Sequence, residues 1–305
     1  MISSNFKKRK PTKRQFNEWV WGWFFIAPTI IGLIILNIIP IIQSLYLSFF
    51  RTGDFGRGNI FVGFDNYVRL IQDEQVWYAV RNTLTYTFFV VPIAISISLV
   101  VAVFLNEKIV GRTMYRIIYF IPMVAAPAAV TMVWRWLYNN HYGLINYLLG
   151  KIGIGNIDWI NDPNISLFSI VIVGVWSIIG YNVVLILAGL QEIPKDFYEA
   201  SRIDGANRIY QFFRITIPLL SPTLFFISVT TIIQSMQVFD FIYMMIDVTS
   251  PAYESTVSLV YLFYNNSFRY SNQGYGSAIV MLLLLIIMII TVFQMKAQKK
   301  WVNYM

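Results

Sequence analysis

Long apolar stretches, separated by shorter polar segments, run along almost the whole chain. Six of them are long enough to cross the ~30 Å hydrocarbon core of a bilayer, which takes about 20 helical residues. They lie near residues 22–44, 83–105, 116–138, 166–190, 218–239 and 276–295. Prolines interrupt the first three, and membrane helices tolerate this where neighbouring helices satisfy the freed carbonyl groups. The pattern predicts an all-α membrane protein, with an N-terminal segment over 1–21 and a six-helix transmembrane domain over 22–305.

The polar segment between the fourth and fifth stretches has a helical period of its own. Pro194 can open a short helix, and Gly205 can adopt the left-handed turn that ends it. The helical period places four apolar residues on one face, namely Ile193, Phe197, Ala200 and Ile203, and three charged residues on the other, namely Lys195, Glu199 and Arg202. A second apolar repeat, from Ile209 to Ile217, predicts another short helix at an angle to the first. A surface helix lying flat on the bilayer is the alternative interpretation.

Composition places the chain in lipid. Hydrophobic residues make up 57% of the sequence, charged residues make up 12%, and the mean hydropathy is +0.60. A chain with so little polar side-chain material cannot cover the surface of a soluble globule.

Lysine and arginine are distributed unevenly between the two sides that six spans define. With both termini in the cytoplasm, only seven of the 23 basic residues lie outside: Arg51, Arg57, Arg69, Arg81, Arg135, Lys151 and Arg269. This excess inside satisfies the positive-inside rule and places the two-helix loop in the cytoplasm. The net charge of +8 is therefore a topology signal and gives no indication of nucleic-acid binding.

A cluster of basic residues lies between Lys7 and Arg14, just before the first apolar stretch. In a soluble protein such a run is typical of a nucleic-acid or localisation patch. Beside a membrane span, it instead favours contact with anionic lipid head groups. The first apolar stretch is too long for the core of a cleavable signal peptide, so we expect segment 1–21 to remain as a basic cytoplasmic segment.

Residues for catalysis and for metal binding are scarce. The chain has no cysteine, and its one histidine, His141, has no second imidazole or thiolate to complete a metal site. Gly143 and Gly150-Lys151 have the wrong spacing for a phosphate-binding loop, and Ile152 stands where that loop needs serine or threonine. We therefore expect no catalytic residues, no metal and no cofactor in this chain.

The two-helix loop carries a recognisable motif. Glu199-Ala200-Ser201, then Gly205 after three residues, then Ile215-Thr216-Ile217-Pro218 after nine more, resembles the EAA loop of ABC importer permeases. Ser201 replaces the second alanine of that motif and Ile217 replaces its leucine. Further matches in the same order are Pro28, Pro40, Ser44–Phe49, Val62–Tyr67, Arg81–Leu84, Ala188–Pro194 and Leu219–Pro222. Together they resemble the carbohydrate-uptake branch, which is similar to the larger maltose permease subunit and the A-type glycerol phosphate permeases.

The resemblance implies a bundle of type I importer architecture in a bacterial cytoplasmic membrane. It implies a second homologous permease, an ATPase dimer that carries ATP and Mg²⁺, and an extracellular binding protein that delivers a sugar. The residues that it assigns to ATPase coupling are Glu199, Ala200, Ser201, Asp204, Gly205 and Ala206. Glu199 would meet a basic group of the ATPase, Gly205 would set the angle between the loop helices, and Ala200 would allow close approach. Thr249-Ser250-Pro251 departs from the Gly-Gly-Pro turn of many relatives, so the fifth-span outer loop is expected to differ.

Polar and aromatic residues inside the fourth and fifth stretches are the candidates for a substrate pathway. They are Trp176, Tyr181, Asn182, Gln234, Gln237, Asp240 and Phe241. Amide and carboxylate groups match sugar hydroxyls, and aromatic rings match the apolar faces of pyranoses. An intramembrane polar group needs either a partner or a water-filled cavity. The alternative is that the amides bridge helices, each contributing about 1 kcal/mol.

Two other classes of membrane protein remain to be weighed. An ion-coupled secondary transporter of a small polar solute would need charged groups near the membrane midplane and broken helices in paired repeats. The six stretches hold few such groups besides Asp240. A membrane-embedded enzyme would need a catalytic set, and the sequence has none. The sequence therefore favours a permease, with ATP hydrolysis on a separate subunit.

Overall fold

The computed structural model describes residues 12–52, 59–107 and 110–302. Most of the predicted basic segment, residues 1–11, lies outside the described part. Within the described residues, five helical stretches are long and apolar enough to cross a membrane, or six if one bent pair counts as a span. The five are 16–47, α4 (Glu74–Asn106), α8 (Ser166–Glu192), 221–245 and α16 (Gln273–Trp301).

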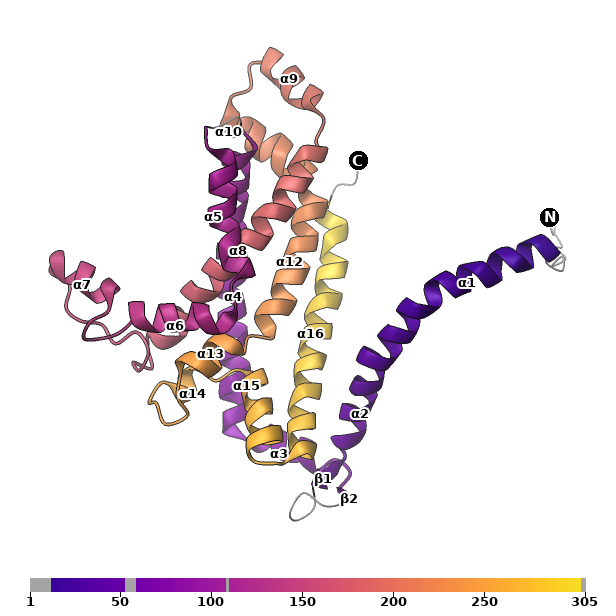
Figure 1. Ribbon diagram of the computed structural model, residues 1–305, viewed down its shortest axis with the longest axis vertical. Helices are drawn as coiled ribbons and strands as arrows, with labels where there is room; N and C mark the ends of the chain where they lie inside the picture. Colours follow the sequence, from indigo (N-terminus) through magenta and orange to yellow (C-terminus); the bar gives the residue numbers. More distant parts are fainter. Residues whose placement is uncertain (1–11, 53–58, 108–109, 303–305) are drawn as a thin grey trace.

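The first spanning stretch is a curved arm that leans away from the other helices (Figure 1). It consists of α1 (Lys13–Leu33), a π-helical turn (Ile34–Ile38) and α2 (Ile39–Leu47). Pro28 lies inside α1, and Pro40 lies in the first turn of α2, directly after the π-helical turn that joins the two helices. No residue of its most apolar window is buried, and α2 makes its contacts with α16.

The third predicted span turns sharply within its length. Residues 116–138 fall on α5 (Arg112–Val124) and α6 (Pro127–Leu137), whose axes differ by 101°. Ala125 and Ala126 between them are extended, with ψ of 138° and 133°. Proline disfavours helical geometry in the residue before it, and Pro127 itself starts a new helix. The span predicted over 116–138 is therefore broken into two helices at these residues.

The core of the bundle lies where α4, α8 and α12 (Ser221–Met236) pack together (Figure 1). Small residues allow this approach, because a side chain at Gly174 of α8 would collide with the hydroxyl of Tyr86 on α4. One apolar cluster includes Tyr86 and the residues towards α15 (Leu259–Tyr264). A second cluster, which includes Ile186 and Leu220, lies towards the end that bears α9 (Lys195–Ile203).

Shorter elements complete the fold. They are the antiparallel hairpin β1 (Phe50–Thr52) and β2 (Asn59–Phe61), α3 (Asp65–Gln72), α7 (Leu144–Lys151), α13 (Asp240–Met245), α14 (Tyr253–Thr256), α15 and a π-helical turn (Asn265–Arg269). The hairpin and α3 lie at one end of the bundle, whereas α7 projects to the side (Figure 1). The hairpin is the one sheet in the described residues, so the all-α prediction holds for the rest. Asn66 ties it to the bundle by donating to the carbonyl oxygens of Ser48 and Phe50 at 2.8 and 2.9 Å.

The departure at Thr249-Ser250-Pro251 forms a turn held by polar contacts. The backbone N–H and the hydroxyl of Thr249 both donate to Asp247 Oδ1, at 2.9 and 2.8 Å. These two hydrogen bonds lower the pKa of the Asp247 carboxyl, because they favour its charged form. Ser250 then donates to Asn161 Oδ1 at 3.1 Å, which links this loop to the loop before α8.

Candidate functional site: a two-helix loop and a polar cavity

The loop between α8 and α12 lies at one end of the bundle and contains two short helices (Figure 1). The first is α9 (Lys195–Ile203), and the second, α10 (Arg208–Gln211), continues through a π-helical turn (Phe212–Thr216) into α11 (Ile217–Leu219). Pro194 occupies the position just before α9, one residue earlier than a first-turn proline. Asn207 caps α10 by accepting from the backbone N–H of Tyr210 at 2.8 Å.

Gly205 ends α9 in the left-handed conformation, with φ of +81°. The backbone N–H of Gly205 donates to the carbonyl of Arg202 at 3.0 Å, and that of Ala206 donates to Ser201 at 2.9 Å. This is the hydrogen-bond pattern of a Schellman cap. A Cβ atom at Gly205 would meet nothing within 4 Å. Glycine suits this position because of its backbone angle. Space does not decide the choice, since a side chain would meet no neighbouring atom.

Two polar links join the helices on either side of this turn. Ser201 donates to the carbonyl of Tyr198 at 2.9 Å and accepts from the side-chain amide of Gln211 at 2.9 Å. The Gln211 amide is buried, with 6% of the residue exposed. The hydroxyls of Tyr198 and Thr216 lie 3.1 Å apart. These bonds hold α9 against α10 and the π-helical turn that follows it.

The apolar face predicted for α9 is largely exposed. Ile193 is buried, but Phe197 and Ile203 are 47% and 87% exposed. The inward contact comes from Tyr198, which packs against the cluster of Ile186 and Leu220. The helix stands off the end of the bundle and touches it along one side only (Figure 1). The apolar face is therefore left for another molecule to cover.

The surface of the loop combines apolar and charged groups. Ile209, Tyr210 and Phe213 are exposed beside α9, at 70%, 55% and 61%. Glu199 and Asp204 are exposed as well, and neither forms an ion pair with a described residue. Scattered apolar residues are ordinary on a protein surface, but a cluster among charged groups is typical of a protein interface.

A cavity of about 440 Å³, with a mostly apolar lining and several polar side chains, lies between α4, α5, α6, α8, α12 and α13. Five of the seven pathway candidates line it: Tyr181, Gln234, Gln237, Asp240 and Phe241. Gln234, Gln237 and Asp240 are exposed, so their polar groups are free to meet a solute. Thus the fourth and fifth stretches, which are distant in sequence, contribute to one wall.

Trp176 and Asn182 lie outside this cavity lining. Trp176 makes an edge contact with Trp134 on α6, with ring centroids 5.8 Å apart. Asn182 is fully buried, and its Oδ1 accepts a hydrogen bond from the Thr231 hydroxyl of α12 at 3.4 Å. Asn182 follows Tyr181 directly and therefore points about 100° away from it around the helix. Its placement matches the alternative in which intramembrane amides bridge helices.

The sequence reasoning missed several residues of the cavity. Tyr86 of α4, Ser177 of α8, and Ser235 and Phe239 beside the glutamines also line it. Tyr86 could have been found, because it is one of few polar side chains in the second apolar stretch. Ser177 gives no such signal, because its hydroxyl donates to the Val173 carbonyl at 2.9 Å within the same helix.

A second, more polar cavity of about 420 Å³ lies between the segment around His141, the loop before α8 and the end of α13. Its lining includes Arg135, His141, Asp158 and Asp247. Arg135 donates to the carbonyl of Met244 at 3.1 Å and so connects α6 to α13. Among the described residues, no group of three or more His, Cys, Asp and Glu side chains is placed to hold a metal ion.

Comparison with known proteins agrees with the motif and the fold. The family of binding-protein-dependent transport system inner membrane components matches residues 75–303. A probable ABC transporter permease, YesP of Bacillus subtilis, is 33% identical over 286 residues, covering 93% of this chain and 92% of the relative. The trehalose/maltose permease MalF of Thermococcus litoralis is 32% identical over 285 residues, covering 93% and 96%.

Solved structures support the same architecture. A chain of a bacterial alginate ABC transporter, crystallised with an alginate-bound periplasmic protein, superposes with a TM-score of 0.82. It is 22% identical in sequence, and the match covers 94% of this chain and 96% of the other. The agreement in fold includes the bundle from which the two-helix loop emerges. The chain belongs to the family of binding-protein-dependent transport system inner membrane components, the permease subunits of ABC importers.

Proposed function

We propose that this permease forms, with a second homologous permease, the membrane pathway for a sugar or oligosaccharide. An extracellular binding protein delivers the sugar, and a separate ATPase dimer drives the cycle. The observation that carries the proposal is the pairing of an exposed two-helix loop at one end of the bundle with a cavity inside the bundle that presents aromatic rings together with Gln234, Gln237 and Asp240. The loop can bind an ATPase and the cavity can hold a solute, and an importer needs both.

Carbohydrate is the substrate class that the cavity favours. Tyr181 and Phe241 offer rings for the apolar face of a pyranose, while Gln234, Gln237 and Asp240 offer hydrogen bonds for its hydroxyls. Relatives at similar identity carry names that point the same way. They include an arabinooligosaccharide permease of Bacillus subtilis and a lactose permease of Rhizobium radiobacter, each 32% identical. We assign the corresponding class, and no particular sugar, to this chain.

The two-helix loop is proposed as the docking site for the ATPase. Phe197, Ile203 and Phe213 supply exposed apolar area, and Glu199 supplies a charge for a basic group on the partner. The Schellman cap and the Ser201–Gln211 link keep the loop rigid. A rigid element transmits closure of the ATPase as movement of the spans, whereas a flexible one would absorb it. ATP and Mg²⁺ would be bound by the ATPase alone.

Orientation follows the distribution of charge. We place both termini and the two-helix loop in the cytoplasm and the hairpin end of the bundle outside. The C-terminal end of α16 lies near the same end of the bundle as α9 (Figure 1), in agreement with this arrangement. The basic residues before α1 would then contact the anionic inner surface of the bacterial cytoplasmic membrane.

The test is reconstitution of the complete complex in vesicles, with the binding protein on one side and ATP on the other. Labelled sugar should accumulate only when both are present. Uptake driven by a proton or sodium gradient without ATP would contradict the proposal and favour the ion-coupled alternative. Of the features that the alternative needs, the described residues supply one broken span, α5 and α6, and the carboxylate of Asp240, which lines the cavity near the start of the short helix α13.

A further inference from the structure

The short helix α13 stands between the two cavities described above. Residues 239–241, around its start, line the cavity of about 440 Å³, which we call the inner cavity. Residues 243–247, at its end, line the cavity of about 420 Å³, which we call the outer cavity. Ile242 and Met245 are buried within this segment. The two cavities therefore share α13 as a wall with an apolar interior.

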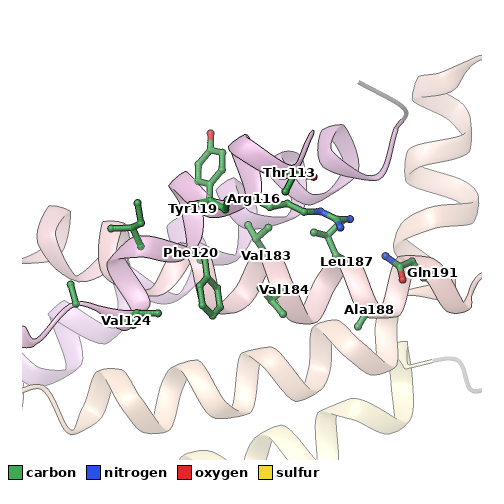
Figure 2. A pocket seen from close by; sticks show the side chains of 14 residues that line it. Thr113, Arg116, Tyr119, Phe120, Val124, Val183, Val184, Leu187, Ala188 and Gln191 are labelled. Carbon is green, nitrogen blue, oxygen red and sulfur yellow. The ribbon is translucent and has the colours of Figure 1, made fainter. Parts of the chain in front are cut away.

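On its other side, the inner cavity continues into a groove of about 810 Å³ between α5 and α8, because Ala125 lines both. The groove follows α8 as far as Gln191, near the end of that helix and the start of the two-helix loop (Figure 2). In the proposed orientation, this chain thus connects its inner cavity to the cytoplasmic end of the bundle. Towards the outside, α13 separates the inner cavity from the outer one.

The wall is firmly attached on the side of α15. The Ser258 hydroxyl, just before α15, donates to the carbonyl of Val238 at 2.7 Å in a buried hydrogen bond. The rings of Phe239 and Tyr243 stack on each other with centroids 5.0 Å apart, and both contact aromatic rings of α15. Packing and a buried hydrogen bond therefore hold α13 from this side.

On the side of α6, the attachment is different. Among the described residues, α6 and α13 share one hydrogen bond, in which the exposed Arg135 guanidinium donates to the Met244 carbonyl at 3.1 Å. This carbonyl lies in the last turn of α13, where a cation is favourable. Arg135 has no ion pair with a described residue. A single charged hydrogen bond in contact with water is weak enough to break and re-form.

The contact between α6 and α13 also lies beside two breaks in the spans. α6 follows the extended Ala125 and Ala126, across which the helix axis turns through 101°. α13 follows residues 237–239, which belong to no helix. Breaks of this kind allow a short helix to move as a unit through changes in a few backbone angles. The α6–α13 contact is therefore where the wall can part with little change elsewhere.

We propose that Arg135 is a positioning residue, which holds α13 against α6 and so keeps the inner cavity closed to the outside. During transport, the bond from Arg135 to Met244 breaks, and the inner and outer cavities join. This inference rests on the proposed function and on the proposed orientation. Cysteine labelling at Asn161 and Asp196, described in the Discussion, tests the orientation separately.

The alternative is that Arg135 only caps the end of α13. A cap affects the stability of the helix, and its loss would not change the side from which a reagent reaches the inner cavity. Access to that cavity from outside is therefore the property that distinguishes the two roles.

The experiment measures this access in the complete transporter, in right-side-out membrane vesicles without ATP. The probe is a charged, impermeant thiol reagent, and its target is Gln237→Cys in the inner cavity of a chain with no native cysteine. This cysteine should react much more slowly than Asn161→Cys, which lines the outer cavity. Adding Arg135→Gln should raise the rate at Gln237→Cys about tenfold, as expected when one of two states loses a charged hydrogen bond. Arg135→Lys should keep the rate low, since lysine can donate to the same carbonyl.

Lys151→Gln is the matched control. Lys151 is also an exposed basic residue on the proposed outer side, but it lies over the ring of Tyr147, with 4.6 Å between its Nζ and the ring centroid. The control removes one outer positive charge, as Arg135→Gln does, and leaves the α6–α13 contact intact. It should therefore leave the rate at Gln237→Cys unchanged.

Two results would overturn the inference. The first is reaction of Gln237→Cys from outside as fast as Asn161→Cys with Arg135 intact, a comparison that needs no substitution at Arg135. The second is a rate at Gln237→Cys that Arg135→Gln leaves unchanged, or that Lys151→Gln raises equally. These measurements use neither sugar nor ATP, whereas the uptake test needs both. Failure of the role of Arg135 is therefore distinguishable from failure of the proposed function.

Discussion

The hydroxyl of Ser201 stands where the EAA motif has alanine, and the structure gives it a specific role. It accepts from the buried Gln211 amide, so the change from alanine adds a tie between the loop helices. The motif alone does not show this role, because the partner lies ten residues away in a second helix. Only the angle between α9 and α10 brings Ser201 and Gln211 together.

Ser201→Ala should weaken coupling more than it weakens folding of the bundle. It leaves the Gln211 amide buried with only the Tyr198 carbonyl, 3.4 Å away, at an expected cost of about 1–3 kcal/mol to the loop. Sugar-stimulated ATP hydrolysis in reconstituted vesicles should fall several-fold. Gln211→Leu should act similarly, and the double variant should be less impaired than the two single effects together predict. Strictly additive effects would show that the Ser201–Gln211 bond contributes nothing.

A second prediction at this scale concerns residues that line the 440 Å³ cavity. Gln237→Ala and Tyr181→Ala should each weaken the apparent affinity of transport by about 1–2 kcal/mol, or up to about thirtyfold, while the complex still assembles. They remove a hydrogen-bonding group and a stacking ring from the same wall. Uptake measured against sugar concentration gives the readout.

The structure supplies a control that the sequence did not. Trp176 was a candidate with the same standing as Tyr181, but its ring contacts Trp134 outside the cavity lining. Trp176→Ala should therefore leave the apparent affinity for sugar unchanged. A loss at Trp176 with none at Tyr181 would mean that the solute follows another face of α8.

At the scale of elements, three of the predicted spans each lie within one unbroken helix. The stretches 83–105, 166–190 and 276–295 fall inside α4, α8 and α16. The 116–138 stretch has the same apolar character, but Ala125 and Ala126 turn it through 101°. Hydrophobicity reports residence in lipid and carries no information about direction, so the pattern could not show this break.

The ends of the first loop helix were predictable from the sequence, but the face on which that helix packs was not. Pro194 and Gly205 mark the ends of α9 through backbone geometry that the sequence displays directly. The face that packs inward depends on where the bundle lies, and here Tyr198 makes the contact while Phe197 faces outward. A helical period identifies two faces, but another chain can cover the apolar one.

Gly205 allows a test of the cap alone. Gly205→Val should strongly impair uptake, because a β-branched residue rarely adopts a positive φ. Gly205→Asn should retain most activity, since asparagine tolerates the left-handed conformation and no neighbouring atom lies near the added Cβ. Initial uptake rates of the two variants, compared at equal membrane insertion, give the answer. Equal loss in both would point to a need for bare backbone at the ATPase surface instead.

At the scale of the whole molecule, one prediction concerns its orientation. Asn161→Cys, in an exposed loop before α8, should react with an impermeant thiol reagent added to intact cells. Asp196→Cys, exposed on α9, should react only after the membrane is opened. The chain has no native cysteine, so each signal is unambiguous. Labelling of Asp196→Cys from outside would reverse the assigned sides.

Among the described residues, two large surfaces are left uncovered by the rest of the chain. They are α1 in the arm and the exposed face of the two-helix loop. This incompleteness fits a subunit that works in an assembly within lipid. The central claim is that the two-helix loop transmits ATP hydrolysis to the spans, and Glu199 is the residue that addresses it most directly.

The deciding measurement is sugar-stimulated ATP hydrolysis by the complete complex carrying Glu199→Lys, reconstituted in vesicles. Glu199 is exposed and has no ion pair with a described residue. Reversal of its charge should therefore spare the fold and disrupt a docked pair worth about 2–5 kcal/mol. Glu107→Lys, an equally exposed reversal in another loop, should remain active. We predict loss of stimulation with Glu199→Lys and partial recovery when the contacting ATPase residue is made acidic; full stimulation in the Glu199→Lys complex would contradict the account.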